Sequence, residues 1–199
     1  MTSPADTQQR IIDAASELMH SRSYADVGVA AICEQAGVQK GSFYHFFPSK
    51  QDLTLAVLDG FSLRMKEALI DKAFADDIPP LARLDRLADL LYRFQAQLHQ
   101  QTGRVLGCPF GNLATELATQ DEPIRKKVDL IFAHLQTHIG QVLQASVETG
   151  ALSDIDVDAT AQAMLAYSEG VMMLAKTRND PAILRDLLPA MAHIRIPAR

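Results

Sequence analysis

Apolar residues recur every three to four positions along almost the whole chain, and the apolar–polar alternation of a strand is absent. A helix of 3.6 residues per turn gathers such residues on one face, so this spacing favours helices that pack against one another. The clearest run, at about 122–149, is followed by Gly150. We predict an all-α protein of about nine helices. They are expected at about 7–21, 28–36 and 39–46, in a long segment after Ser49, at about 79–101, in a short segment ending at about 119, and at about 122–149, 157–177 and 181–192.

The composition is that of a cytoplasmic protein. Of 199 residues, 48% are apolar, which is enough to bury a core without disulfides or a metal. The two cysteines, Cys33 and Cys108, lie far apart and form no CxxC pair, as expected in a reducing cytosol. No stretch resembles a signal peptide, and no apolar run reaches the roughly 20 residues of a membrane helix. We expect no membrane partner.

Residues 29–47 have the pattern of a helix-turn-helix, the motif that places a second helix in the major groove of DNA. Cys33 is the small residue where the two helices cross, and Ala36 ends the first of them. Gly37 can adopt a positive φ, so the chain can turn sharply there. Phe43, with Phe46 and Phe47, supplies the apolar face that fixes the second helix, and its opposite face is left free.

That free face carries groups that bind DNA. A lysine at its N-terminal turn can donate to guanine or phosphate oxygens, hydroxyls can bond phosphate, and a glycine lets the backbone approach closely. A lysine in the first turn of the next helix adds charge beside N–H groups that favour phosphate. The net charge of −5 argues against a nucleic-acid partner, so the case depends on where the charges lie. The predicted DNA contacts are Lys40, Gly41, Ser42, Tyr44, His45 and Lys50.

The run ICEQAGVQKGSFYHFFPSK at residues 32–50, with Tyr24 before it and Leu53 after it, resembles the signature of the TetR family, in outline IAxxAGVxKGxxYxHFxSKxxL. The resemblance implies an all-helical homodimer, usually a repressor. Residues 1–49 would read double-stranded operator DNA, and residues 50–199 would bind a small-molecule effector and dimerise. It assigns the DNA-facing roles to the six residues named above. One departure is Val27-Gly28, where the family often has a Thr or Ser that caps the second helix.

The effector itself is not legible in the sequence. Large side chains of the central helices could line its pocket, although apolar residues at helical spacing more often belong to a core. The candidate lining residues are Leu58, Met65, Leu91, Phe94, Cys108, Phe110, Phe132, Leu135 and Tyr167.

Cys108 has two interpretations. It lies at the expected start of a helix, where free N–H groups favour a thiolate, and the run GCPFGNLA resembles a segment of TetR-family members that include electrophile-sensing repressors. Modification of Cys108 would then release the operator. Alternatively, Cys108 is a small buried residue beside the pocket, which is the commoner state of a free cysteine. Reversible binding of an effector is the main expectation for release.

Residues 157–192 are expected to pair across a two-fold axis, as the resemblance implies. Small residues such as Ala166 and Gly170 allow helices to approach closely, and the same region is rich in Met and Leu.

Other classes of function find little support in the sequence. No phosphate loop, nucleophile elbow or dinucleotide fingerprint is present, so we predict no enzyme and no cofactor. His134 and His138 stand four residues apart, but no further ligand accompanies them, and we predict no metal. The acids at 154, 156 and 158 lack the glycine and glutamate of a calcium loop and fit helix capping better. A helix-turn-helix protein that has lost DNA binding is the remaining alternative, against which the intact face of residues 40–50 argues.

Overall fold

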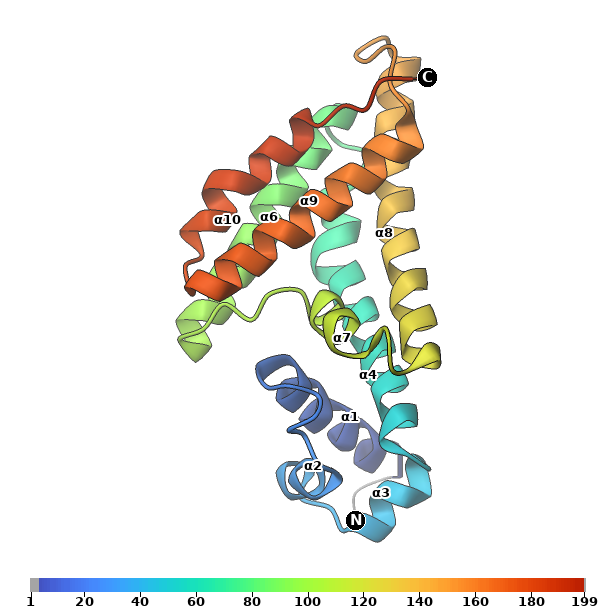
Figure 1. Cartoon of the computed structure of the whole chain (residues 1–199), viewed down its shortest axis with the longest axis vertical. Coiled ribbons are helices and arrows are strands. Elements are labelled where there is room, and N and C mark those ends of the chain that lie inside the picture. Colours follow the sequence, from blue (N-terminus) through green and yellow to red (C-terminus); the bar gives the residue numbers. More distant parts are fainter. Residues whose placement is uncertain (1–3, 199) are drawn as a thin grey trace. The chain divides into compact units, whose positions relative to one another are not determined.

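The computed structural model describes residues 4–198, and within them the all-α prediction is confirmed (Figure 1). Only one isolated β-bridge, between Ile155 and Pro197, interrupts the helices of this range. The helices are α1 (Pro4–Ser21), α2 (Val29–Ala36), α3 (Lys40–Phe46), α4 (Lys50–Met65) with its continuations η1 (Lys66–Ile70) and α5 (Asp71–Ala73), α6 (Pro80–Thr102), α7 (Pro109–Leu117), α8 (Glu122–Glu148), α9 (Val157–Arg178), and α10 (Ala182–Leu187) with its continuation η2 (Leu188–His193).

The chain divides into two compact units. Unit 1 contains the residues up to Arg64 and the segment Pro109–Asp129, and unit 2 contains Met65–Cys108 and Leu130–Arg199. Unit 1 therefore joins the three N-terminal helices to α4 up to Arg64, to α7 and to the start of α8. The boundary between residues 49 and 50, predicted from the sequence, separates DNA binding from effector binding and dimerisation. It stays a prediction.

Several helix ends lie where the sequence signals place them. The Ser49 hydroxyl accepts a hydrogen bond from the amide N–H of Asp52 at 3.1 Å, which caps α4 as expected. The Asp156 carboxylate accepts one from the amide of Ala159 at 2.9 Å and caps α9 in the same way. Gly150, after α8, has a φ of +76°.

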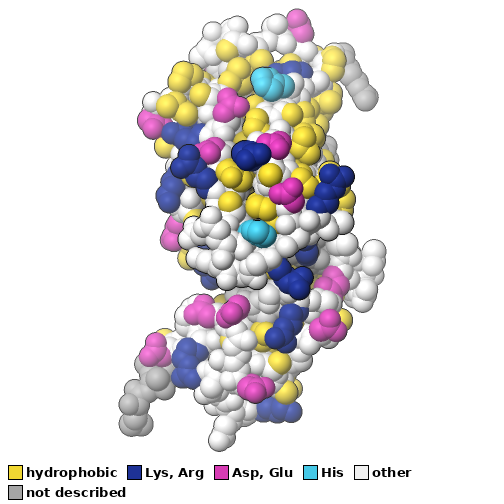
Figure 2. Space-filling model, turned by 90° about the vertical axis from the view of Figure 1, so that its left-hand side faces the viewer, with side chains coloured by type: hydrophobic (Ala, Val, Ile, Leu, Met, Phe, Trp, Pro, Cys, Tyr) yellow, Lys and Arg dark blue, Asp and Glu magenta, His cyan; other side chains and the backbone are white. Residues whose placement is uncertain are grey.

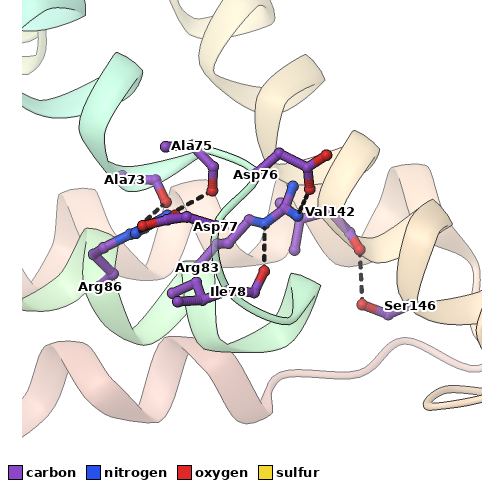
Figure 3. Close-up of polar contacts among 9 residues, drawn as sticks. All are labelled: Ala73, Ala75, Asp76, Asp77, Ile78, Arg83, Arg86, Val142 and Ser146. Atoms are coloured by element: carbon purple, nitrogen blue, oxygen red, sulfur yellow. Dashed lines mark hydrogen bonds and ion pairs between the residues drawn. The ribbon is translucent and has the colours of Figure 1, made fainter.

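Arg83 and Arg86 of α6 fix the connection from α5 to α6 in unit 2 (Figure 3). Arg83 donates to the carbonyl of Ile78 at 3.1 Å and pairs with Asp76. The Arg86 guanidinium donates to the carbonyls of Ala73 and Ala75 at 3.0 and 2.7 Å, and it pairs with Asp77 at 2.7 Å. The hydrogen bond from Arg86 holds the pKa of Asp77 below its usual value. These bonds satisfy carbonyls at and just after the end of a helix, where no further turn supplies an N–H donor.

Unit 2 has its own core, made by Leu84 of α6, Ile139 and Leu143 of α8, and Met164 of α9, with α10 and η2 packed on α6 and α9. Hydrophobic side chains also remain on its surface, as Figure 2 shows for the side that carries α10. The large exposed ones in this unit are Phe94, Leu130, Met173, Leu174, Leu187 and Ile196.

Candidate nucleic-acid interface

Three short helices and the first turns of α4 enclose a separate core in unit 1. Phe43 of α3 is fully buried at its centre, with Ile11 and Leu18 of α1, Ile32 of α2 and Leu53 of α4 around it. Cys33, at the crossing of α2 and α3, is only 5% exposed, and burial raises the pKa of its thiol. The core fixes the angle of α3 as the helix-turn-helix pattern predicted, and it leaves the opposite face of α3 open.

The turn between α2 and α3 is held by Gly37 and by an arginine of α1. Gly37 has a φ of 63° and a ψ of 42°, in the left-handed region expected from the sequence. The amide of Val38 donates to the carbonyl of Cys33 at 2.9 Å, which closes the end of α2. Arg10 donates to the carbonyl of Gly37 at 2.9 Å and also to that of Ala36. The Arg10 charge is thus used inside the motif.

Substitution of Gly37 by alanine is expected to destabilise the protein by about 1–2 kcal/mol. Alanine is strained at this φ, and its Cβ would lie 3.0 Å from the Arg10 guanidinium. Urea denaturation followed by circular dichroism measures the change. Gly41→Ala is the matched control, because nothing lies within 4 Å of a Cβ there and the residue is helical. Equal stability losses in the two variants would contradict this account of the turn.

The open face of α3 contains most of the residues predicted to contact DNA. Lys40, Gly41 and His45 are exposed, Tyr44 is 53% exposed, and Ser42 is half-buried. Gly28 precedes α2 without any side-chain cap, as the departure at Val27-Gly28 implied. On the side of the molecule seen in Figure 2, acidic and basic side chains are interspersed in the lower part.

Lys50 is placed differently from the other five. Its ammonium lies 3.6 Å from the centroid of the Tyr24 ring and donates to the Tyr24 carbonyl. Burial lowers its pKa, against an opposing effect of Glu116. The ammonium is therefore engaged within the chain here, and its contact with DNA stays a prediction.

Glu116 of α7 is a residue that the sequence analysis did not single out. Its carboxylate accepts hydrogen bonds from the Ser23 hydroxyl at 2.6 Å and from the amides of Tyr24 and Ala25 at 2.9 and 2.8 Å. Burial raises its pKa, but these hydrogen bonds outweigh that effect and the pKa lies below its usual value. The donors are more than 90 residues away in sequence, so no local pattern marks this contact.

The predicted pocket residues are distributed over both units. Leu58 and Phe110 are fully buried in unit 1, where the Phe110 ring lies edge-on to Phe61. The other candidates belong to unit 2, where Phe94 is 38% exposed and Tyr167 donates its hydroxyl to the Leu187 carbonyl. Their roles in effector binding stay predictions.

Cys108 is buried beside a carboxyl group. It is 9% exposed, and Glu169 of α9 is hydrogen-bonded to it. Burial raises the pKa of Glu169, against a lowering effect of the hydrogen bond with Cys108. A buried thiol next to an acid fits a packing residue better than an accessible nucleophile.

Unit 2 has an open groove of about 680 Å³ along α8 and the start of α9. Its lining includes the polar residues Gln136, Gln141, Gln144 and Asp158 but none of the predicted pocket residues. His138 stacks on Phe74 instead of meeting a third ligand, and burial lowers its pKa. No group of three or more potential metal ligands occurs among the described residues, and none of their helices is long and apolar enough to cross a bilayer.

Comparisons with known proteins agree on one family. Residues 11–57 match the family described as bacterial regulatory proteins, tetR family. Residues 80–191, more than half of the chain, match the tetracyclin repressor-like C-terminal domain. The two matches cover the helix-turn-helix and most of the helices that follow it.

The similar proteins are regulators of transcription. An uncharacterized HTH-type transcriptional regulator in the lacX 3' region of Lactococcus lactis is 32% identical over 90% of this chain and 88% of its own length. The transcriptional regulator AcuR of Cereibacter sphaeroides is 34% identical over 87% of this chain and 78% of its own length. A crystal structure of a regulatory protein TetR from Rhodobacter sphaeroides superposes with a TM-score of 0.81, at 30% identity, over 94% of this chain and 98% of that one.

Proposed function

The chain belongs to the TetR family of transcriptional regulators, and on this premise we propose that it is a cytoplasmic repressor that binds a palindromic operator as a homodimer and is released by a small-molecule effector. The observation that carries the proposal is the open face of α3, which presents Lys40, Gly41, Tyr44 and His45 outward from a fully buried Phe43. A helix held in this way can enter the major groove with its polar side chains toward the base edges.

Alanine at Lys40 or at Tyr44 is expected to weaken specific binding by about 1–3 kcal/mol without unfolding the protein. Both side chains project from the open face, where they can reach a base edge or a phosphate. The probe is an inverted repeat in the DNA upstream of this gene, found by footprinting and then titrated by fluorescence anisotropy at fixed salt. If Lys40 contacts a phosphate, its loss also lowers the slope of log K against log salt by about one.

Lys72→Ala is the control, since it removes an equal charge from an exposed site of unit 2. Binding that shows no sequence preference, or equal losses in all three variants, would refute the proposal.

The homodimer surface is proposed to lie along the exposed side of α9. Ala166 and Met173 are exposed there and Ala163 and Gly170 on the same side are half-buried, so a second helix can approach closely.

The expected region 157–192 also contains side chains that serve the subunit's own core. Leu184 and Leu188 are fully buried, and Met164, Val171 and Met172 are at most 6% exposed. On α10, Leu187 is 39% exposed and Ile183 is half-buried, so this helix can still contribute to the dimer surface.

The effector is proposed to bind in the C-terminal helical domain. The match to a tetracyclin repressor-like C-terminal domain supports this placement. Reversible binding is favoured over covalent modification because Cys108 is 9% exposed and has an acid as its neighbour.

A further inference from the structure

We propose that Glu116 is a positioning residue for DNA recognition, through which α7 holds the turn between α1 and α2 and the start of α4 in the arrangement that reads the operator. The inference rests on the proposed function and names a residue that positions the helices which bind DNA. Glu116 lies in α7, outside the helix-turn-helix, and every group that it contacts belongs to unit 1.

The carboxylate of Glu116 makes three hydrogen bonds to one short stretch of the chain. A single carboxylate accepts from three consecutive residues, the hydroxyl of Ser23 and the amides of Tyr24 and Ala25, at 2.6 to 2.9 Å. Hydrogen bonds to an ionised acceptor are the stronger kind, and together they satisfy two N–H groups of a turn that no helix ladder serves. Their combined effect keeps the pKa of Glu116 below its usual value, so the residue is charged near neutral pH.

Tyr24 links the hydrogen bonds of Glu116 to the first residue of α4, which follows the helix-turn-helix. Its amide is bound by Glu116, while its carbonyl and its ring both hold the ammonium of Lys50. Lys50 is the first residue of α4 and follows α3 after only three residues. Glu116 therefore fixes a residue that contacts both ends of the motif, the approach to α2 and the exit from α3.

Two further polar contacts join the turn after α7 and the start of α8 to α4. Gln51 donates to Asp121 at 2.8 Å, and Lys127 pairs with Asp59. Both contacts are made by side chains of α4, Gln51 and Asp59. The hydrogen bonds of Glu116 instead reach the turn before α2. Removal of Glu116 should loosen that turn and leave the remaining attachment of α4 in place.

The N-terminal end of α7 continues a segment that is anchored in unit 2. Gln95, 2% exposed, donates to the carbonyl of Gly107 at 3.0 Å and accepts from its amide at 3.3 Å. Asn179, at the end of α9, accepts from the amide of Val105 at 2.8 Å. The chain then passes from Cys108 directly into the nine residues of α7.

The test compares Glu116→Ala and Glu116→Gln with the full-length wild-type chain. Amide hydrogen exchange is followed by NMR, and affinity is measured for an operator selected from random duplexes by the wild-type protein. In Glu116→Ala we expect exchange at Tyr24 and Ala25 to rise about tenfold or more, and the operator Kd to rise about tenfold. Glu116→Gln keeps an acceptor oxygen without the charge and should lie between the alanine variant and wild type.

Glu122→Gln is the matched control, because it removes the same charge from a residue whose ion pairs, within residues 4–198, are with Arg125 and Lys126 of its own helix. It should change neither readout. A general loss of stability would raise exchange throughout unit 1 and would not be rescued by glutamine.

Each remaining outcome is decisive. Unchanged exchange at Tyr24 and Ala25, or faster exchange with wild-type affinity, would overturn the role of Glu116 while leaving the proposed function intact. If the wild-type protein selects no duplex at all, the proposed function itself fails, and the inference fails with it.

Discussion

Phe43→Ala is expected to cost about 3–5 kcal/mol of folding free energy and to abolish operator binding at physiological temperature. Phe43 is fully buried, and its ring packs edge-on against Tyr44 at 5.1 Å between centroids and beside Phe47 at 6.1 Å. Truncation leaves a cavity in a small core that the short helices cannot refill. This loss is a large part of the free energy of unfolding of a typical domain, which is about 5–15 kcal/mol.

Urea denaturation followed by far-ultraviolet circular dichroism measures this loss, and Tyr44→Ala is its control. The two substitutions remove neighbouring rings of similar size from α3, one buried and one 53% exposed. We expect the Tyr44 variant to keep its stability within about 1 kcal/mol and to lose mainly affinity for DNA. A Phe43 variant that unfolds at the wild-type urea concentration would contradict the packing described for α3.

Ala166→Glu is expected to convert the dimer into monomers at micromolar concentration and to weaken operator binding by about 100-fold or more. A glutamate at a close helix contact would be buried without a partner, which costs several kcal/mol per ion. Because the two subunits are related by a two-fold axis, each dimer would contain two such buried charges. Monomers lose the advantage of two linked half-sites. Light scattering coupled to size-exclusion chromatography gives the mass, and an anisotropy titration gives the affinity.

Two further variants test where the surface lies. Gln97→Glu adds the same charge at an exposed position of α6 and should stay dimeric. Leu187→Glu on α10 should weaken the dimer less than Ala166→Glu, because the neighbouring Leu184 and Leu188 are already buried within the subunit. A fully dimeric Ala166→Glu protein with wild-type affinity would exclude this side of α9.

Local signals in the sequence were sufficient for the architecture and for the helix-turn-helix. The recurrence of apolar residues predicted the helices, and Ser49, Gly37 and Asp156 marked helix ends that the structure has in the expected form. Each of these signals acts over a few residues, through helix periodicity, a positive φ or a capping oxygen. Such effects do not depend on the rest of the fold.

The free face of α3 also followed from the sequence, because one buried residue in a helix fixes the direction of its neighbours. With Phe43 inside, Gly41 and His45 must point outward, Tyr44 lies on the flank and Lys40 lies in the first turn, and the structure has all four exposed. The match to the family signature covered this same segment.

Contacts between distant residues were decided only by tertiary structure. Glu116 reaches Ser23 across 93 residues, and Arg10 reaches Gly37 across 27. Lys50 has a position typical of a phosphate contact, yet its ammonium lies on the Tyr24 ring, because burial there offers a carbonyl and an aromatic face. No periodicity encodes which distant partner a charged side chain meets, since that depends on how the helices pack. The sequence alone thus determined which helix faces outward, and the tertiary structure decided which residues hold that helix in place.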